Sequence, residues 1–202
     1  MDSQSASPDR LEIVIAGYTG NANLAKTGLA STDPKIRASA IVALHNLKQL
    51  SPDDLAQALD DQDSKVRRRA CELAASYSSV PLSNALRDPD PFVVEMALWA
   101  LGERADRTEL VTICEIAKNH PESLVREAAV ASLGAIGDRG GLETVIRGLK
   151  DRPNVRRRAV VALAAFEGED VDAALRAATS DRDWQTRQIA EDLLEITEGL
   201  RD

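Results

Sequence analysis

Histidine and cysteine, the side chains that most often hold metals or attack substrates, are rare in this sequence. The two histidines, His45 and His120, lie far apart, and neither has cysteine or carboxylate partners at the spacing of a zinc site. The two cysteines, Cys71 and Cys114, lie in apolar periodic segments without a CxxC pair, which predicts buried thiols in a reducing compartment. The motifs GxSxG, GxxxxGKS/T and GxGxxG do not occur. We therefore expect no catalytic residue, no metal site and no cofactor, and a protein that is not an enzyme.

The amino-acid composition excludes several further classes of protein. The chain has 202 residues, of which 44% are hydrophobic and only 3% aromatic, and its formal charge is -8. The apolar fraction excludes a disordered or collagen-like chain. The acidic balance argues against general affinity for nucleic acid or for an anionic membrane. The N-terminus has no signal-peptide pattern and no apolar run approaches the roughly 18 residues of a spanning helix, so we expect a cytoplasmic protein without a membrane partner.

Charged residues recur in a regular pattern. An acid, a small residue or proline, one residue, an aliphatic residue, arginine, two residues and alanine follow one another in Asp33–Ala40, and related runs return five times. The arginine position falls at Arg37, Arg67, Val94, Arg126, Arg156 and Arg187, at intervals of 27 to 32 residues, with valine as the one exception. Six copies at a nearly constant interval indicate an internal repeat.

Each repeat is expected to form two helices, of which the second begins at the acid. Apolar residues after the acid recur at helical spacing, and no segment alternates with the period of a strand. The expected helix-start residues are Asp33, Asp63, Asp90 and Asp183 as N-caps and Pro34, Pro91 and Pro153 at the first helical position. The expected helix stops are Gly102, Gly137 and Gly168. The sequence therefore predicts an all-α fold.

Helix pairs of this size must stack to bury their apolar faces, which predicts a solenoid. The residue after the repeated alanine is apolar in five repeats (Ile41, Cys71, Leu98, Val130, Val160) and is Glu191 in the last. We interpret Glu191, with Asp192, Glu195 and Glu198, as the solvated side of a terminal cap. The expected organisation is a flexible tail over residues 1–9 and one solenoid over residues 10–202, with a capping helix at about 10–18.

The repeats resemble HEAT repeats, in the short form also found in phycobilisome lyase-type proteins. The runs related to Asp33–Ala40 and the segment Ser132–Asp138 carry the resemblance, which covers roughly residues 20 to 200. It implies a right-handed superhelix of about six helix pairs, with the second helices on the concave side. It also implies a ladder of ion pairs between successive repeats, formed by Asp33, Arg37, Asp63, Arg67, Asp90, Glu122, Arg126, Arg156, Asp183 and Arg187. Val94 and Arg152 depart from that pattern, which puts the ladder in doubt around the third to fifth repeats.

Trp99 is the largest side chain predicted on the outward side of the second helices. It either packs against an adjacent helix or remains exposed as an anchor for a partner, since tryptophan and arginine dominate interface hot spots. In the second case, charged residues of the same face would form its rim and select the partner: Arg68, Glu72, Glu95, Glu127 and Arg157.

The leading functional hypothesis is an interaction scaffold that binds another protein on its concave face. One alternative is nucleic-acid binding similar to that of the HEAT-like alkylpurine DNA glycosylases, with Trp99 and Glu103 one turn apart. Residues 104–158 carry 11 basic and 8 acidic side chains, but residues 163–202 carry 4 and 11, and the net charge disfavours this partner. A second alternative is a chromophore lyase-like subunit, which the two buried-looking cysteines support little.

Overall fold

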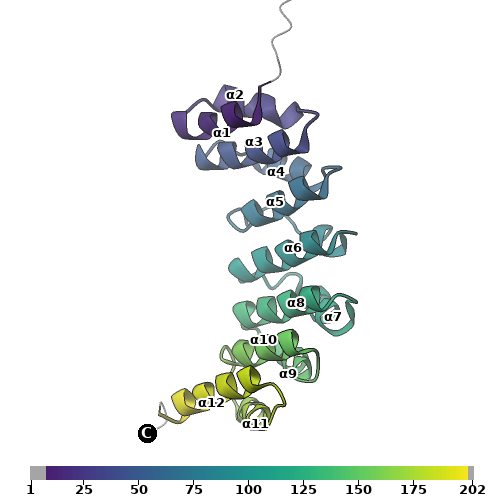
Figure 1. Ribbon diagram of the computed structural model, residues 1–202, viewed down its shortest axis with the longest axis vertical. Helices are drawn as coiled ribbons and strands as arrows, with labels where there is room; N and C mark the ends of the chain where they lie inside the picture. The colour runs from purple at the N-terminus through teal and green to yellow at the C-terminus, as the bar shows by residue number, and fades with distance from the viewer. Residues whose placement is uncertain (1–7, 200–202) are drawn as a thin grey trace, which may run out of the picture. The chain divides into compact units, whose positions relative to one another are not determined.

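The computed structural model describes residues 8–199, with the side chains of residues 8–196, and every regular element in this range is a helix (Figure 1). The predicted all-α fold is therefore confirmed. The chain divides into two compact units, Met1–Ala97 and Leu98–Asp202, and the boundary between them falls inside α6 (Pro91–Glu103). Residues 1–7 of the expected tail lie outside the described residues, and Asp9 is the N-cap of the first helix.

The first described helix of the first unit is α1 (Arg10–Thr19), which packs against α3 (Pro34–Asn46). A short helix α2 (Ala22–Thr27) and a 3-10 turn η1 (Gly28–Ala30) precede α3, and the next pair is α4 (Pro52–Leu59) with α5 (Ser64–Ala74). The close approach of α1 and α3 depends on Gly17, because a Cβ there would lie 2.8 Å from the Cα of Ala43.

The third repeat lacks the first helix that the repeat pattern predicts. Only a 3-10 turn, η2 (Ala85–Arg87), stands before α6. Pro81 and Pro89 stand on either side of η2, and proline disrupts a helix interior. The interval of 27 residues to Val94, the shortest in the chain, reflects this missing helix.

The second unit contains the end of α6 and three complete helix pairs. These are α7 (Leu110–Asn119) with α8 (Ser123–Ile136), α9 (Leu142–Gly148) with α10 (Pro153–Leu163), and α11 (Glu169–Ala178) with α12 (Trp184–Gly199). A 3-10 turn, η3 (Arg139–Gly141), precedes α9. The second helices pack in series, α8 on α10 and α10 on α12.

The helix starts follow the predicted caps. The carboxylates of Asp33 and Asp63 accept hydrogen bonds from the backbone N–H of Lys35 and Lys65, both at 2.8 Å. Asp90 accepts from the N–H of Phe92 at 2.9 Å, and Asp183 from that of Thr186 at 3.1 Å. Pro34, Pro91 and Pro153 each begin a helix, as predicted.

Of the three predicted helix stops, one is confirmed, one lies a single residue before the end of its helix, and one is wrong. Gly137 ends α8 in the left-handed conformation, with φ of 64°, as expected. Gly102 is the penultimate residue of α6, and a Cβ there would approach the Cα of Ser132 to 3.3 Å, so its small size serves packing. Gly168 is the N-cap of the following helix α11, with φ of 126°. The position of a glycine in the sequence does not by itself show whether it ends a helix, begins the next one or permits close packing.

The residue after the repeated alanine is buried in five repeats, as its apolar character predicts. Ile41 and Cys71 in the first unit, and Leu98, Val130 and Val160 in the second, have at most 1% of their surface exposed. Glu191, at the same position in α12, is exposed together with Asp192 and Glu195, and the side chain of Glu198 lies outside the described set.

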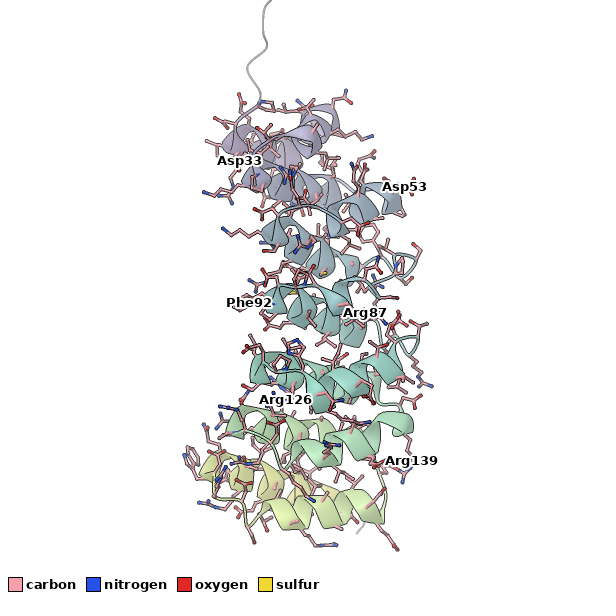
Figure 2. The ribbon with its side chains drawn as sticks, turned by 90° about the vertical axis from the view of Figure 1, so that its right-hand side faces the viewer. Asp33, Asp53, Arg87, Phe92, Arg126 and Arg139 are labelled. Atoms are coloured by element: carbon pink, nitrogen blue, oxygen red, sulfur yellow. The ribbon has the colours of Figure 1, made fainter. Side chains whose placement is uncertain are left out.

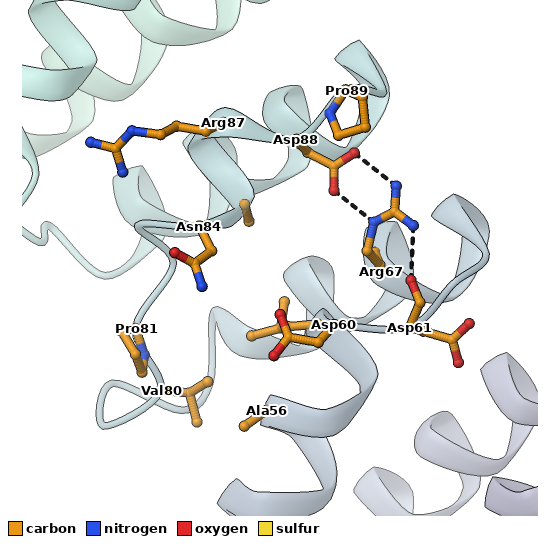
Figure 3. Close-up of a pocket in the computed structure, with 12 residues that line it drawn as sticks. Ala56, Asp60, Asp61, Arg67, Val80, Pro81, Asn84, Arg87, Asp88 and Pro89 are labelled. Carbon is orange, nitrogen blue, oxygen red and sulfur yellow. Dashed lines mark hydrogen bonds and ion pairs between the residues drawn. The ribbon is translucent and has the colours of Figure 1, made fainter.

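Arginine–aspartate pairs join successive repeats, but the acid is not the one expected. Arg37 donates through Nε and Nη2 to the carboxylate of Asp61, both at 2.7 Å, and not to Asp63. Arg67 likewise pairs with Asp88 and not with Asp90 (Figure 3). The reason is that the N-cap carboxylates are held at their own helix starts, whereas the acid two residues earlier lies in the loop within reach of the arginine.

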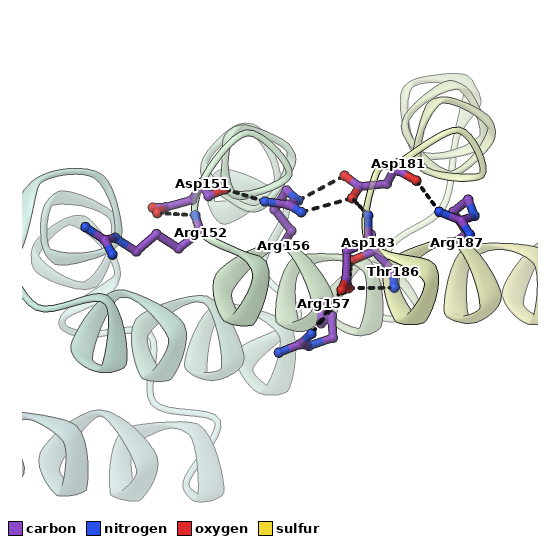
Figure 4. Close-up of polar contacts among 8 residues, drawn as sticks. All are labelled: Asp151, Arg152, Arg156, Arg157, Asp181, Asp183, Thr186 and Arg187. Carbon is purple, nitrogen blue, oxygen red and sulfur yellow. Dashed lines mark hydrogen bonds and ion pairs between the residues drawn. The ribbon is translucent and has the colours of Figure 1, made fainter.

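The second unit has the same pairs. Arg126 pairs with Asp151, and Arg156 pairs with Asp181, the second of which is drawn in Figure 4. Asp151 stands one residue before Arg152, so the substitution of arginine for the N-cap acid in the fifth repeat does not remove the pair. Among the residues that the structure describes, Arg187 in α12 keeps only the carbonyl contact, donating from Nη1 to the backbone oxygen of Asp181 at 2.8 Å. Val94, at the arginine position of α6, is buried and contributes no charge.

Each ladder arginine also donates to the loop that precedes its own helix. Nη1 of Arg37 contacts the backbone oxygen of Ser31 at 2.9 Å, and Nη1 of Arg126 contacts that of His120 at 2.7 Å. The hydrogen bonds from Arg37 lower the pKa of Asp61, and those from Arg126 lower the pKa of Asp151. These arginines thus stabilise the stacking of helix pairs within each unit.

Candidate interaction surface

One side of the second helices is left open to solvent in both units. We define the second-helix face as the positions two, five, nine and twelve residues after each N-cap, which lie within a narrow arc of a helix. In the first unit these positions include Lys35, Ala38, Val42, Lys65, Arg68, Glu72, Phe92 and Glu95. In the second unit they include Trp99, Leu124, Glu127, Ala131, Asn154, Arg157, Val161, Gln185, Gln188 and Asp192.

Along this face, the residue five positions after one N-cap contacts the residue two positions after the N-cap of the next repeat. The guanidinium of Arg68 lies 5.7 Å from the ring centroid of Phe92, which projects from the start of α6 and is 50% exposed (Figure 2). In the second unit, the side-chain amide of Asn154 donates to the carboxylate of Glu127 at 2.8 Å. The guanidinium of Arg157 donates to Oε1 of Gln185 at 2.8 Å. The face is therefore an ordered surface and not a set of independent side chains.

A groove lies on this face in the first unit, between α1, α3 and α5, with a volume of about 370 Å³. Its charged lining residues are Arg10, Lys35, Lys65 and Arg69, and its apolar lining includes Val14, Tyr18, Ala38 and Val42. None of the residues that line it is acidic. We call it the basic groove.

Trp99 is 43% exposed on α6 in the second unit. The same face of this unit carries two other partly exposed apolar side chains, Leu124 at 39% and Val161 at 45%. Ala131 occupies a neighbouring position of the face with a small side chain, so the indole is the largest group there. Of the two hypotheses for Trp99, this exposure favours the anchor.

The charged residues expected around Trp99 divide between the two units. Arg68, Glu72 and Glu95 belong to the first unit, where Glu72 pairs with Arg69. Glu127 and Arg157 belong to the second unit with Trp99. There Glu127 lies 3.6 Å from Arg158, and Arg157 lies 3.3 Å from Asp183 (Figure 4). Asn154, Arg157, Arg158 and Val161 line a hollow of about 210 Å³ with Glu127.

Several residues of the face were missed by sequence reasoning, notably Lys35, Lys65, Phe92 and Asn154. All four stand two residues after an N-cap, a position that the repeated pattern left unassigned. The recurrence of lysine there in the first two repeats is the signal that could have indicated a basic surface.

A second hollow, of about 420 Å³, lies in the first unit between α4 and η2 (Figure 3). Arg67, Asp61 and Asp88 line it, but all three are engaged in the ladder. Asp60 and Arg87 at its edge are exposed, and Arg87 donates to the backbone oxygen of Ser83. The hollow therefore has no convergent group suited to catalysis.

His45 and the two cysteines lie in surroundings that do not form a metal site. Within residues 8–196, no group of three or more histidine, cysteine or acidic side chains is placed to hold a metal ion. Nδ1 of His45 lies 3.1 Å from the hydroxyl of Tyr77, whose pKa is raised by burial. Cys71 and Cys114 are buried free thiols.

A sequence profile of HEAT repeats matches residues 52–112 and 110–195, which together span most of the chain. The chain belongs to the HEAT-repeat family. Its resemblance to HEAT repeats is thereby confirmed, and the arginine–aspartate pairs are contacts between HEAT repeats. No curated protein matches this sequence.

The solved structures to which this chain is similar include two engineered proteins. The designed armadillo repeat protein YIII(Dq)4CqI is 18% identical, with a TM-score of 0.60 over 86% of this chain and 98% of its own. An engineered protein at 20% identity covers 96% of this HEAT-repeat chain and 86% of its own, with a TM-score of 0.44. The first likeness supports an all-α repeat solenoid. None of the described helices is long and apolar enough to cross a membrane.

Proposed function

We propose that this HEAT-repeat chain is a non-enzymatic protein-interaction module that binds a partner protein on its second-helix face. Trp99 is the anchor of the proposed site in the second unit. The observation that carries the proposal is the 43% exposure of this indole, whose neighbour on the face, Ala131, has only a small side chain. Burial of the remaining indole surface by a partner would contribute roughly 2 kcal/mol to binding.

The surroundings of Trp99 in its unit support this role. Leu124 and Val161 add apolar surface, while Glu127 and Arg157 add charge that can select a partner. These charged side chains are already held by Asn154, Arg158, Asp183 and Gln185, so they lose little conformational freedom when a partner docks. A face ordered before binding suits a scaffold or adaptor.

The cell compartment is also a proposal. The buried free thiols of Cys71 and Cys114 support a reducing compartment such as the cytoplasm. Neither thiol forms part of the proposed surface.

A capture experiment with matched variants tests the function. Wild-type protein, Trp99→Ala and Val111→Ala are immobilised and exposed to a lysate of the source cells. Val111 is a suitable control because it is 78% exposed on α7, a first helix. We expect a specific partner to be retained by the wild type and by Val111→Ala and lost by Trp99→Ala.

Circular dichroism and thermal unfolding show whether the variants remain folded. Trp99→Ala is expected to keep its helical content, because the indole is not part of the buried core. Equal retention of every protein by all three forms, or no specific retention by the wild type, contradicts the proposal.

A further inference from the structure

We infer that the basic groove of the first unit binds an acidic peptide segment, in which carboxylate side chains flank an apolar residue. This inference adds the chemistry of a ligand to the proposed interaction function. It concerns a different unit from Trp99, so the two proposals can fail separately.

The first support is charge complementarity. The groove gathers Arg10, Lys35, Lys65 and Arg69 around about 370 Å³ and has no acidic lining residue, although the chain as a whole carries a charge of -8. Acidic residues are thus concentrated elsewhere, and the groove is a local positive site. A ligand with carboxylate groups meets opposite charge from three helices.

The second support is the availability of these cations. Lys35 and Lys65 are exposed, and neither ammonium group forms an ion pair within the described part of the chain. The nearby carboxylates of Asp33 and Asp63 cap helices α3 and α5 through the backbone N–H groups of these lysines. The lysine side chains are therefore free to meet a ligand.

Arg10 is held in place from one side. Its Nε donates to Oγ of Ser39 at 3.2 Å, and the same hydroxyl donates to the backbone oxygen of Lys35 at 2.9 Å. This contact uses Nε and leaves the two Nη nitrogens of the guanidinium for a carboxylate. Arg69 differs, because Glu72 already pairs with it and offsets its charge, so Arg10, Lys35 and Lys65 supply the positive charge of the groove.

Apolar surface between the cations indicates a peptide and not a small anion. Ala38 and Val42 lie along α3, and Val14 and Tyr18 of α1 are 38% and 79% exposed. An aliphatic side chain between two acidic residues would cover this surface while its neighbours reach Lys35 and Lys65. A nucleic-acid strand is disfavoured because Tyr18 is the sole aromatic lining residue and the negative chain repels a long polyanion.

The probe is a rhodamine-labelled peptide with two glutamates on each side of a central leucine, measured by fluorescence anisotropy. The control peptide has glutamine in place of every glutamate. We expect the wild type to bind the glutamate peptide in preference to the glutamine peptide, and added salt to weaken that binding.

Paired charge reversals separate the groove from the effect of net charge. Lys35→Glu with Lys65→Glu is expected to weaken binding by about tenfold or more. Lys26→Glu with Lys150→Glu changes the net charge equally at exposed lysines outside the groove and is expected to leave the affinity nearly unchanged. Both variants should keep wild-type helical content, because all four side chains are exposed. Trp99→Ala should bind the peptide like the wild type.

Three results would overturn the inference. They are failure of the wild type to bind the glutamate peptide, equal weakening by both double variants, and tighter binding of a labelled single-stranded oligonucleotide that Lys35→Glu with Lys65→Glu abolishes. None of them affects the proposed role of Trp99, which is measured by partner capture.

Discussion

Arg67 and Asp88 form a two-point contact, with Nε and Nη2 of the guanidinium 2.6 and 2.8 Å from the two carboxylate oxygens. The third nitrogen, Nη1, donates to the backbone oxygen of Asp61 at 2.8 Å (Figure 3). One side chain therefore ties the loop before its own helix to the loop before the next. Since Asp61 itself pairs with Arg37, these contacts form a continuous chain through the first unit.

Asp61→Asn is expected to destabilise the protein. The substitution keeps the shape of the side chain but removes the charge that Arg37 faces in a largely buried pair. Breaking a charge-assisted hydrogen bond of this kind costs about 2 kcal/mol in free energy of unfolding. Chemical denaturation measures the loss. Asp60→Asn, at an exposed neighbouring position, should change stability little, and an equal effect of both would contradict the role of the pair.

The Arg37–Asp61 pair predicts that acid lowers the stability of the folded protein. Because the hydrogen bonds from Arg37 lower the pKa of Asp61 in the folded protein, the unfolded chain binds the proton more readily. The stabilisation is present above the ordinary carboxyl pKa of about 4 and is lost as pH falls through the lowered value. Unfolding measured from pH 6 to pH 2 should show a smaller loss of stability for Asp61→Asn than for the wild type. An unchanged pH dependence would contradict this assignment.

Gly134→Ala is expected to destabilise the second unit by about 1 to 3 kcal/mol. A Cβ at Gly134 would lie 2.7 Å from the Cβ of Ala162 and 2.9 Å from its Cα, so α8 and α10 would have to separate. Gly102→Ala is the matched comparison, because the nearest atoms there lie at 3.3 Å. In Gly102→Ala the steric cost is smaller, and a gain in helix propensity of about 1 kcal/mol offsets part of it. A smaller loss for Gly134→Ala than for Gly102→Ala in thermal unfolding would contradict the packing argument.

Ser132→Ala is expected to leave stability unchanged or to raise it by up to about 1 kcal/mol. The hydroxyl of Ser132 is buried without a hydrogen-bond partner, so its removal relieves a desolvation cost. Ser39→Ala makes the opposite prediction, a loss of about 1 kcal/mol, because that hydroxyl bonds both Arg10 and the backbone of α3. Denaturant titration measures the stability of both variants. Equal losses of stability in Ser132→Ala and Ser39→Ala would contradict the expected difference between them.

Sequence reasoning succeeded where the interaction is local to one helix. The caps formed by Asp33 and Asp63 depend on neighbouring residues, and proline at the first helical position follows the same local rule. It failed where two residues satisfy the same pattern. Asp61 and Asp63 both precede the helix of Arg67, and only the tertiary arrangement decides which carboxylate meets an arginine from the preceding repeat.

The same contrast between local and tertiary interactions applies to the candidate surface. Trp99 could be recognised as a large residue on the outward side, but its exposure depends on the helices that surround it. The basic groove was not predicted because Arg10, Lys35 and Lys65 come from three separate helices. The absent first helix before Phe92 was missed since the repeat pattern rests on the second helices, which the third repeat keeps.

The most direct test of the interaction surface is the fluorescence of Trp99 when the captured partner binds. Trp184→Phe removes the other tryptophan, which is 64% exposed, and leaves Trp99 as the single indole. The free variant should emit as a solvated indole. We predict that saturating partner shifts the emission to shorter wavelength and protects the indole from acrylamide quenching. A complex that forms at full occupancy without changing either property would contradict the assignment of Trp99 as the anchor.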